Sequence, residues 1–309
     1  ELNSGFMAMS AMERLASGYG TDPAITKLLD ERDVYIVPVV NPDGVRAVWS
    51  EQRMWRKNRA ANADGTTGVD VNRNYPFLFG ACGSSGSGSS EVFRGPSAGS
   101  EPEVRTMMAL QRAVRPELYV DFHSYGNEVL SLYPPCATVT PEMKAMGKRY
   151  ADQLRAPMGF ATRAPSGSGE APHWYWSQGT LSYLVEVGNA FQPRFEDTVR
   201  DEQKVWAGLK EALTTWAPAA RGRVTDSAGT PLVATFTVQQ PIFRHGETLS
   251  SRAGDGAFSL WLPVGTWDVV VSAEGYAPKT VRVTVETYDQ TQALDVRLEP
   301  AGTRPIAAR

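Results

Sequence analysis

Hydrophobic residues recur at helical spacing in several long stretches of the chain and form short continuous runs between them. The helical spacing predicts five helices, over residues 2–18, 22–32, 101–114, 141–155 and 195–215. The continuous apolar runs predict buried strands, over residues 34–40, 118–125, 129–133 and 181–187. Because strands and helices alternate without hairpin turns, we predict an α/β fold with a mixed sheet and helices on both faces.

Turn and cap residues mark the borders of these elements. The sequence Asn41-Pro42-Asp43-Gly44 is typical of a turn after the first strand. Ser100 and Glu103 have the spacing of a capping box, which predicts that a helix begins just after Ser100. The Gly- and Ser-rich stretches 80–100 and 165–169 are expected to be loops.

The pattern changes after residue 216. Residues 217–220 have the composition of a short linker, and from there apolar and polar residues alternate, as at Val281, Val283 and Val285. Such alternation predicts an antiparallel β-sandwich over residues 221–300. Residues 301–309 are expected to be a loose tail. We therefore divide the chain into a first domain over 1–216, a small all-β domain and a tail.

Composition narrows the class of protein. The 309 residues carry a net charge of −3, which gives no electrostatic footprint for nucleic acid. No apolar run approaches the roughly 18 to 20 residues of a membrane span. Cys82 and Cys136 are either two free thiols or one disulfide. We favour the disulfide because both lie in Gly-, Ser- or Pro-rich loops, and it would indicate an oxidising, secreted or periplasmic location.

Four polar elements stand at predicted strand ends or in neighbouring loops: His123, Arg56, the pair Asn72-Arg73, and Glu186. Taken alone, His123 is more often a packed histidine, and the basic stretch 53–59 is more often a solvated loop. Glu186 lies inside an apolar run, where a carboxylate is costly to bury unless it has a partner or a role. A carboxylate at such a place suits a general base, and arginine suits a carboxylate or oxyanion.

Together these residues resemble the zinc metallocarboxypeptidase family, which includes the pancreatic-type and bacterial carboxypeptidases. The matching stretches are NPDG at 41–44, RMWRKNR at 53–59, GVDVNRNY at 68–75, SSEVFRG at 89–95, HSY at 123–125, LYPP at 132–135 and VEV at 185–187. The Gly/Ser loop and the WRKNR segment look most like bacterial carboxypeptidase T. Residues 221–300 resemble the transthyretin-like sandwich that follows the catalytic domain in some carboxypeptidases.

The resemblance implies a role for each matched residue of the catalytic centre. His123 and Glu1 match zinc ligands, so the implied cofactor is zinc. Glu186 matches the carboxylate that activates the water held by the zinc. Arg56 matches the arginine that binds and polarises the scissile carbonyl and stabilises the oxyanion.

Other matched residues concern the substrate. Asn72 and Arg73 match the pair that grips the terminal carboxylate of a peptide. Glu170 falls where bacterial relatives carry an acidic residue for basic C-terminal side chains. The resemblance also implies a cis peptide bond between Ser124 and Tyr125, which would turn Tyr125 toward the substrate groove.

Two departures from the family pattern affect this assignment. The first zinc histidine of the family would lie two residues before Glu1, so we expect that an upstream piece belongs to the protein. His173 and His245 do not fit the vacant place. Pro165 stands where the family has a mobile active-site tyrosine, and Tyr175 is the nearest substitute.

The sequence leaves three functions open. The first is a zinc-dependent exopeptidase that removes C-terminal residues from peptides or proteins. The second is a zinc amidase or D,L-peptidase acting on cell-wall peptides in the same fold, which would suit the loss of the tyrosine. The third is a non-catalytic peptide-binding module, against which an intact Glu186 argues. The expected assembly is a monomer.

Overall fold

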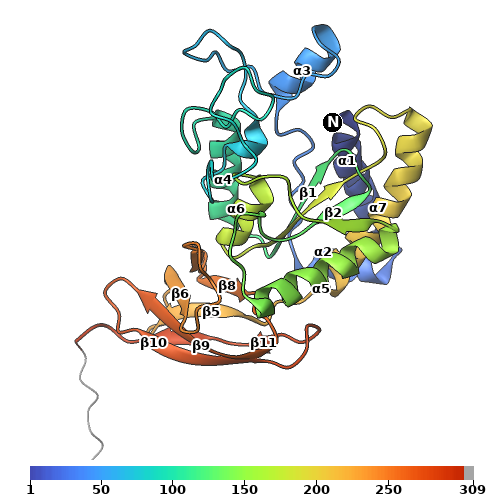
Figure 1. Ribbon diagram of the computed structural model, residues 1–309. Coiled ribbons are helices and arrows are strands. Elements are labelled where there is room, and N and C mark those ends of the chain that lie inside the picture. Colours follow the sequence, from blue (N-terminus) through green and yellow to red (C-terminus); the bar gives the residue numbers. More distant parts are fainter. Residues whose placement is uncertain (303–309) are drawn as a thin grey trace, which may run out of the picture.

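The centre of the molecule is a four-stranded mixed sheet with strand order β1-β4-β2-β3 (Figure 1). The computed structural model describes residues 1–302. The strands are β1 Leu118–His123, β2 Glu128–Leu130, β3 Ala161–Arg163 and β4 Leu181–Glu186. β1 and β4 run parallel, β2 is antiparallel to β4, and β3 is parallel to β2. The predicted α/β class with a mixed sheet is confirmed.

Helices cover both faces of the sheet. Within residues 1–302 the helices are α1 Leu2–Gly18, α2 Pro23–Glu31, α3 Pro42–Ser50, α4 Pro102–Val114, α5 Pro141–Met158, α6 Ala171–Ser177 and α7 Phe195–Thr215, and α3 lies apart from the sheet (Figure 1). Neighbouring residues of β4 identify the two faces, because successive side chains of a strand point to opposite sides. Tyr183 donates to the carbonyl of Gly147 in α5, whereas Ser182 donates to the carbonyl of Pro172 in α6. The two faces are thus covered by α5 and by α6.

Two helices, α3 and α4, begin in a different way from the one that the sequence predicts. NPDG is not a free turn: Asn41 caps α3 by accepting the N–H of Gly44 at 2.8 Å, and Pro42 occupies the first helical position. The capping box predicted at Ser100 is absent, because α4 begins after Glu101 without a side-chain cap. The side chain of Glu103 instead accepts from Asn58. α6 and β3 were not predicted.

The strand predicted over residues 34–40 is wrong. These residues belong to no strand, and their exposure alternates from one residue to the next, with Val37 and Val39 well exposed. Within residues 1–302, β1 pairs only with β4, so its other edge is open toward this segment. A cavity of about 1810 Å³ is lined by both. A continuous apolar run becomes a buried strand only when strands flank it.

Two further sheets form the region predicted as a sandwich. One has the order β10-β9-β6-β7, and the other joins β11, β8 and β12 to β5. The strands are β5 Ala220–Asp226, β6 Ala234–Val238, β7 Leu249–Ser250, β8 Ala257–Leu260, β9 Gly265–Ala273, β10 Lys279–Val285, β11 Gln292–Ala293 and β12 Val296–Leu298. The first sheet is antiparallel, as predicted, whereas β5 pairs parallel with β11 and β12. Most of the predicted tail lies outside the described residues.

The two sheets pack closely against the central part. Arg221 in β5 donates two hydrogen bonds to the carboxylate of Glu117, at 2.5 and 2.6 Å. Trp261 donates to the carbonyl of Glu117 at 2.9 Å, and its ring meets Tyr150 of α5 edge-on. Residues 218–220 are buried rather than exposed. No helix of residues 1–302 is long and apolar enough to cross a membrane.

The predicted disulfide is present. Cys82 is bonded to Cys136 across a sequence separation of 54 residues, which ties the Gly/Ser loop to the chain that follows β2. In the chain-entropy model, a bridge over a loop of this length stabilises the native state because it lowers the conformational entropy of the unfolded chain. The bridge also holds Gly83, whose carbonyl accepts a hydrogen bond from Arg73.

Replacing both Cys82 and Cys136 with serine should lower the free energy of unfolding by about 2–4 kcal/mol, because the unfolded chain regains freedom. Urea unfolding followed by circular dichroism measures the change. In the presence of a reductant, the parent protein and the double variant should unfold at the same urea concentration. Equal stability without reductant, or two free thiols by mass spectrometry, would contradict the bridge.

Candidate active site

Two neighbouring strands end side by side and carry His123 and Glu186. β1 and β4 are parallel, and His123 is the direct register partner of Glu186. Tyr119, four residues before His123, stacks on Tyr175 of α6 with ring centroids 3.8 Å apart. Because strand side chains alternate, His123 also faces the side covered by α6. Both residues therefore lie at the carboxyl ends of their strands, where ligand sites of α/β sheets collect.

The imidazole of His123 lies between two carboxylates. Oε2 of Glu1 is 2.8 Å from Nδ1, and Oδ2 of Asp121 is 3.3 Å from Nε2. The side-chain amide of Asn72 also approaches Nε2, at 3.3 Å. Burial alone would lower the pKa of His123, but Asp121 and Glu1 outweigh it and hold the pKa well above its usual value.

The guanidinium of Arg56 is fixed by two carboxylates. Nε and Nη2 donate to Oδ2 of Asp70 at 3.1 and 2.9 Å, and Nη1 donates to Oε1 of Glu1 at 2.9 Å. Burial would raise the pKa of Glu1, but His123 and Arg56 overcome it and lower the pKa to about 2. Glu1 is therefore a carboxylate that joins Arg56 to His123.

The carboxylate of Glu186 is only partly paired. Oε1 lies 3.5 Å from Nη2 of Arg163, whereas Oε2 is buried without a hydrogen-bond partner. Burial raises the pKa of Glu186 against the lowering effect of His123. A buried carboxylate oxygen without a partner is costly, and such atoms are rare in proteins. A raised pKa brings this group toward the range of an effective general base.

Asn72 and Arg73 belong to a short 3₁₀ helix, η1 Val71–Arg73, which Asp70 caps through the N–H of Asn72. The side-chain oxygen of Asn72 accepts the N–H of Ala171 at 2.8 Å, which connects η1 to the first turn of α6. Arg73 itself is only 5% exposed. η1 therefore places two polar side chains against the start of α6, close to His123.

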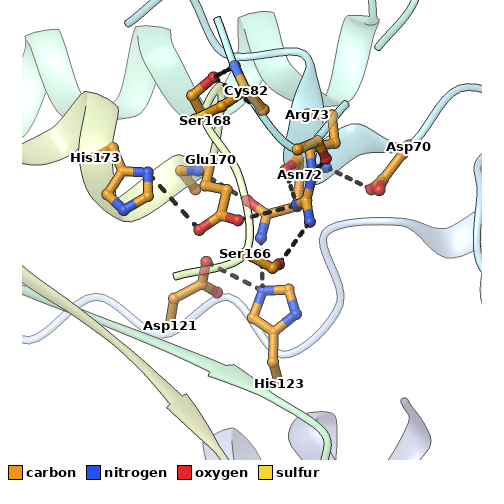
Figure 2. A network of polar contacts seen from close by, with 12 residues as sticks. Asp70, Asn72, Arg73, Cys82, Asp121, His123, Ser166, Ser168, Glu170 and His173 are labelled. Carbon is orange, nitrogen blue, oxygen red and sulfur yellow. Dashed lines mark hydrogen bonds and ion pairs between the residues drawn. The ribbon is translucent and has the colours of Figure 1, made fainter. Parts of the chain in front are cut away.

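Glu170 and His173 lie deep beside Arg73 (Figure 2). Oε1 of Glu170 is 3.1 Å from Nη1 of Arg73, and its Oε2 is 3.7 Å from Nδ1 of His173. Both the Glu170 and the His173 side chains are 2% exposed. Burial raises the pKa of Glu170 to about 7 and lowers the pKa of His173 to about 3. His173 is therefore neutral at ordinary pH.

Tyr125 stands apart from this network, at the surface. The peptide bond between Ser124 and Tyr125 is cis, as expected. The ring of Tyr125 is 48% exposed and meets Phe191 edge-on, with centroids 4.8 Å apart. Together the two rings form an aromatic surface that begins two residues after His123.

The sequence reasoning missed Asp70, Asp121 and His173. Asp70 fixes Arg56, Asp121 approaches His123, and His173 faces Glu170. A signal was available for two of them. Asp121 precedes His123 by two residues on one strand face. His173 follows Glu170 by three residues at the start of a helix, a spacing that makes neighbours.

The family model of zinc carboxypeptidases matches residues 1–205. The chain belongs to the zinc carboxypeptidase family. Carboxypeptidase A2 of Mus musculus is 32% identical over 225 residues, which cover 67% of this chain and 54% of the relative. Carboxypeptidase A2 of Rattus norvegicus is 38% identical over 225 residues, which again cover 67% of this chain and 54% of the relative. A metallocarboxypeptidase A-like protein of Trichophyton verrucosum is 30% identical, over 63% of this chain and 51% of the relative.

The chain spans about half the length of these curated relatives. Solved structures show the same fold. Thrombin-activatable fibrinolysis inhibitor matches with a TM-score of 0.62 and 24% identity, covering 68% of this chain and 58% of the other. Carboxypeptidase A from Helicoverpa armigera matches with a TM-score of 0.53 and 24% identity, over 68% of this chain and 56% of the other.

The zinc that this carboxypeptidase family implies has two fitting donors here. The carboxylate of Glu1 and the imidazole of His123 are both zinc ligands by type, and their nearest atoms converge to 2.8 Å. Within residues 1–302, no group of three or more His, Cys, Asp or Glu is arranged to hold a metal. A catalytic zinc usually takes three protein ligands, so the donors that the structure describes account for part of such a site.

Proposed function

We propose that this chain forms the catalytic and substrate-binding part of a zinc-dependent exopeptidase, which hydrolyses the C-terminal peptide bond of peptides or proteins. The observation that carries the proposal is the Glu186 carboxylate, which ends β4 beside His123 and keeps one buried oxygen without a partner. A protein that only binds peptides has no use for such a group. The family membership of the chain supports the same reaction.

Each residue of the proposed catalytic centre has its own role in hydrolysis. Glu1 and His123 would hold the zinc, which supplies Lewis-acid chemistry and lowers the pKa of water toward about 7. Glu186 takes a proton from the attacking water at its free oxygen and later gives it to the leaving amine. Arg56 meets the negative charge that develops on the scissile carbonyl oxygen, and Asp70 keeps its guanidinium oriented for this task.

Substrate recognition explains why the reaction removes terminal residues. Asn72 and Arg73 bind a carboxylate, which only the end of a peptide offers beside its last bond. Tyr125, which is exposed beside Phe191, would contact the preceding residues. Glu170, whose carboxylate lies 3.1 Å from Arg73, would contact the last side chain, so C-terminal Arg or Lys should be accepted alongside neutral residues.

The setting of the enzyme follows from the same features. We propose a monomer that acts outside the cytoplasm, secreted or periplasmic, because the Cys82–Cys136 bridge needs an oxidising compartment. The β-sheets after residue 220 are proposed to be a transthyretin-like domain. Its close contacts with Glu117 and Tyr150 support a role in stabilising the catalytic part.

The test is a peptide assay on a zinc-loaded, longer version of the protein that supplies a histidine two residues before Glu1. A short peptide with a free C-terminal carboxylate should lose one residue at a time, as followed by mass spectrometry. Its C-terminal amide is the matched control and should remain intact. Cleavage of cell-wall peptides alone would instead identify an amidase or D,L-peptidase, and zinc binding without any cleavage would identify a binding module.

A further inference from the structure

Four of the five N–H donors of Arg73 are already engaged within the protein. Nε donates to the carbonyl of Gly83 at 3.0 Å, Nη1 to the carbonyl of Asn72 at 2.7 Å and Nη2 to Oγ of Ser166 at 3.1 Å. Nη1 also faces the carboxylate of Glu170 at 3.1 Å. Because a carboxylate binds arginine through two N–H groups, an incoming substrate must displace one of these acceptors.

Glu170 is the acceptor that a substrate carboxylate would displace. The other three acceptors are neutral and do not repel an anion, whereas Glu170 carries a like charge when it is ionised. Released from Arg73 as an anion, Glu170 would be a buried charge without a partner, which is far more costly than a buried neutral acid. Burial raises the pKa of Glu170 to about 7, so the neutral acid is accessible near neutral pH.

A partner for the neutral acid is in place. Oε2 of Glu170 and Nδ1 of His173 are both buried without hydrogen-bond partners, and they lie 3.7 Å apart (Figure 2). When the ring hydrogen of the neutral His173 is on Nε2, both atoms are acceptors and cannot bond to each other. A proton on Oε2 would convert this pair of unsatisfied acceptors into a hydrogen bond.

We propose that Glu170 is an exchangeable internal ligand of Arg73, which the terminal carboxylate of a substrate displaces while Glu170 takes one proton from solvent and turns to His173. The exchange breaks the Arg73–Glu170 ion pair, forms the Arg73–substrate ion pair and leaves Glu170 as a neutral acid. With a C-terminal Arg or Lys, the substrate cation neutralises the displaced carboxylate, and no proton is needed. This inference rests on the proposed function, in which Arg73 binds the terminal carboxylate.

The charged and titratable groups that face Glu170 come from three parts of the fold. The charged groups are Asp70 and Arg73 at η1 and Asp121 and His123 on β1, and the neutral His173 lies on α6. Arg73 and His123 favour the ionised form of Glu170, whereas Asp70 and Asp121 disfavour it. These groups are the same in a Glu170→Gln variant, so the difference between the two proteins isolates the proton taken up by Glu170.

The direction of the pH dependence follows from the exchange. A bound substrate anion raises the pKa of Glu170 above its free value of about 7, so binding takes up a proton. Affinity is then fully present below pH 7 and falls as the pH rises through it. For a substrate with a neutral C-terminal side chain, affinity should fall by about tenfold between pH 6 and pH 8. Each pH unit above the pKa of Glu170 in the unbound protein lowers the binding constant by at most about tenfold.

The experiment is calorimetric binding of acetyl-Gly-Phe to the protein, at pH 6 and 8 and in buffers of different ionisation enthalpy. The parent protein should show the tenfold loss and proton uptake on binding. Glu170→Gln should bind acetyl-Gly-Phe with little pH dependence, about tenfold more tightly than the parent at pH 8, and with less proton uptake. Acetyl-Gly-Arg should lose less affinity with pH in the parent. Glu142→Gln, an exposed change in α5, is the matched control and should behave like the parent.

The outcomes separate this inference from the proposed function. If Glu170→Gln keeps the pH dependence and proton uptake of the parent, or binds no more tightly at pH 8, the exchange is refuted. If the parent binds acetyl-Gly-Phe no better than its amide, the role of Arg73 fails and the exchange fails with it. His173→Phe provides a second test, because removing the acceptor should weaken binding of acetyl-Gly-Phe severalfold; unchanged binding would also refute the exchange.

Discussion

Glu186→Gln should keep the zinc of the protein and remove almost all turnover, when it is made in a zinc-loaded version that supplies a histidine two residues before Glu1. The amide keeps the size of the carboxylate but cannot accept the proton of the attacking water. General-base catalysis typically contributes about 10²–10⁴-fold to a rate, so kcat should fall by that factor. Because Glu186 is not proposed as a zinc ligand, zinc content and KM should change little.

The measurement combines metal analysis with steady-state hydrolysis of a C-terminally free peptide. Glu128→Gln is the matched control, because Glu128 is the register partner of Glu186 on β2 and pairs with the same Arg163. This control should remain active, since Glu128 holds no part of the proposed chemistry. A Glu186→Gln protein with near-normal kcat would show that another group is the base, and loss of zinc would show that Glu186 is a ligand.

Zinc content should differ strongly between the present chain and a version extended upstream by a segment with a histidine two residues before Glu1. The extended version should hold about one zinc per chain, because catalytic zinc takes three protein ligands. The present chain supplies two of these ligands, Glu1 and His123, so it should retain little zinc after dialysis. Chelator treatment should abolish the peptidase activity of the extended version.

Metal analysis and a peptide assay on both versions provide this test. An extended version in which the upstream histidine is replaced with alanine is the matched control, and it should behave like the present chain. Full zinc occupancy and activity in the present chain would show that another residue completes the site. An upstream sequence without a histidine at that place would also overturn the expected ligand set.

The helices that were predicted carry a local signal in the sequence. Repeated apolar spacing marks α1 and α7, and the helix predicted over residues 22–32 is α2, which Asp22 caps. The strand expected over 34–40 failed because strand formation depends on neighbours that local sequence does not reveal. The composition of NPDG predicts a turn, although Asn followed by Pro is also a common start of a helix.

The family resemblance predicted the roles of the site residues. The contacts between buried side chains were less predictable, because they depend on how the folded chain packs. The resemblance grouped Glu1, Arg56 and His123 in one centre, and the carboxylate of Glu1 contacts both other side chains. The contact between Arg73 and Glu170 was not foreseen, because η1 and the stretch from Ser166 to the start of α6 come together only in the folded chain. No periodicity in the sequence indicates which buried acid will face which arginine.

The contacts between the first 216 residues and the later sheets limit the modularity of this chain. Tyr133 donates to Glu247 at 2.8 Å, and the carbonyl of Ser177 at the end of α6 accepts the N–H of Thr248 at 2.7 Å. Trp176, in the same helix, packs against Phe243. A version trimmed at residue 216 would uncover Tyr133 and also Trp176, which lies on α6, the helix that directly follows Glu170. Cutting the chain after residue 216 would therefore also disturb α6, beside which we propose that the terminal carboxylate of the substrate binds.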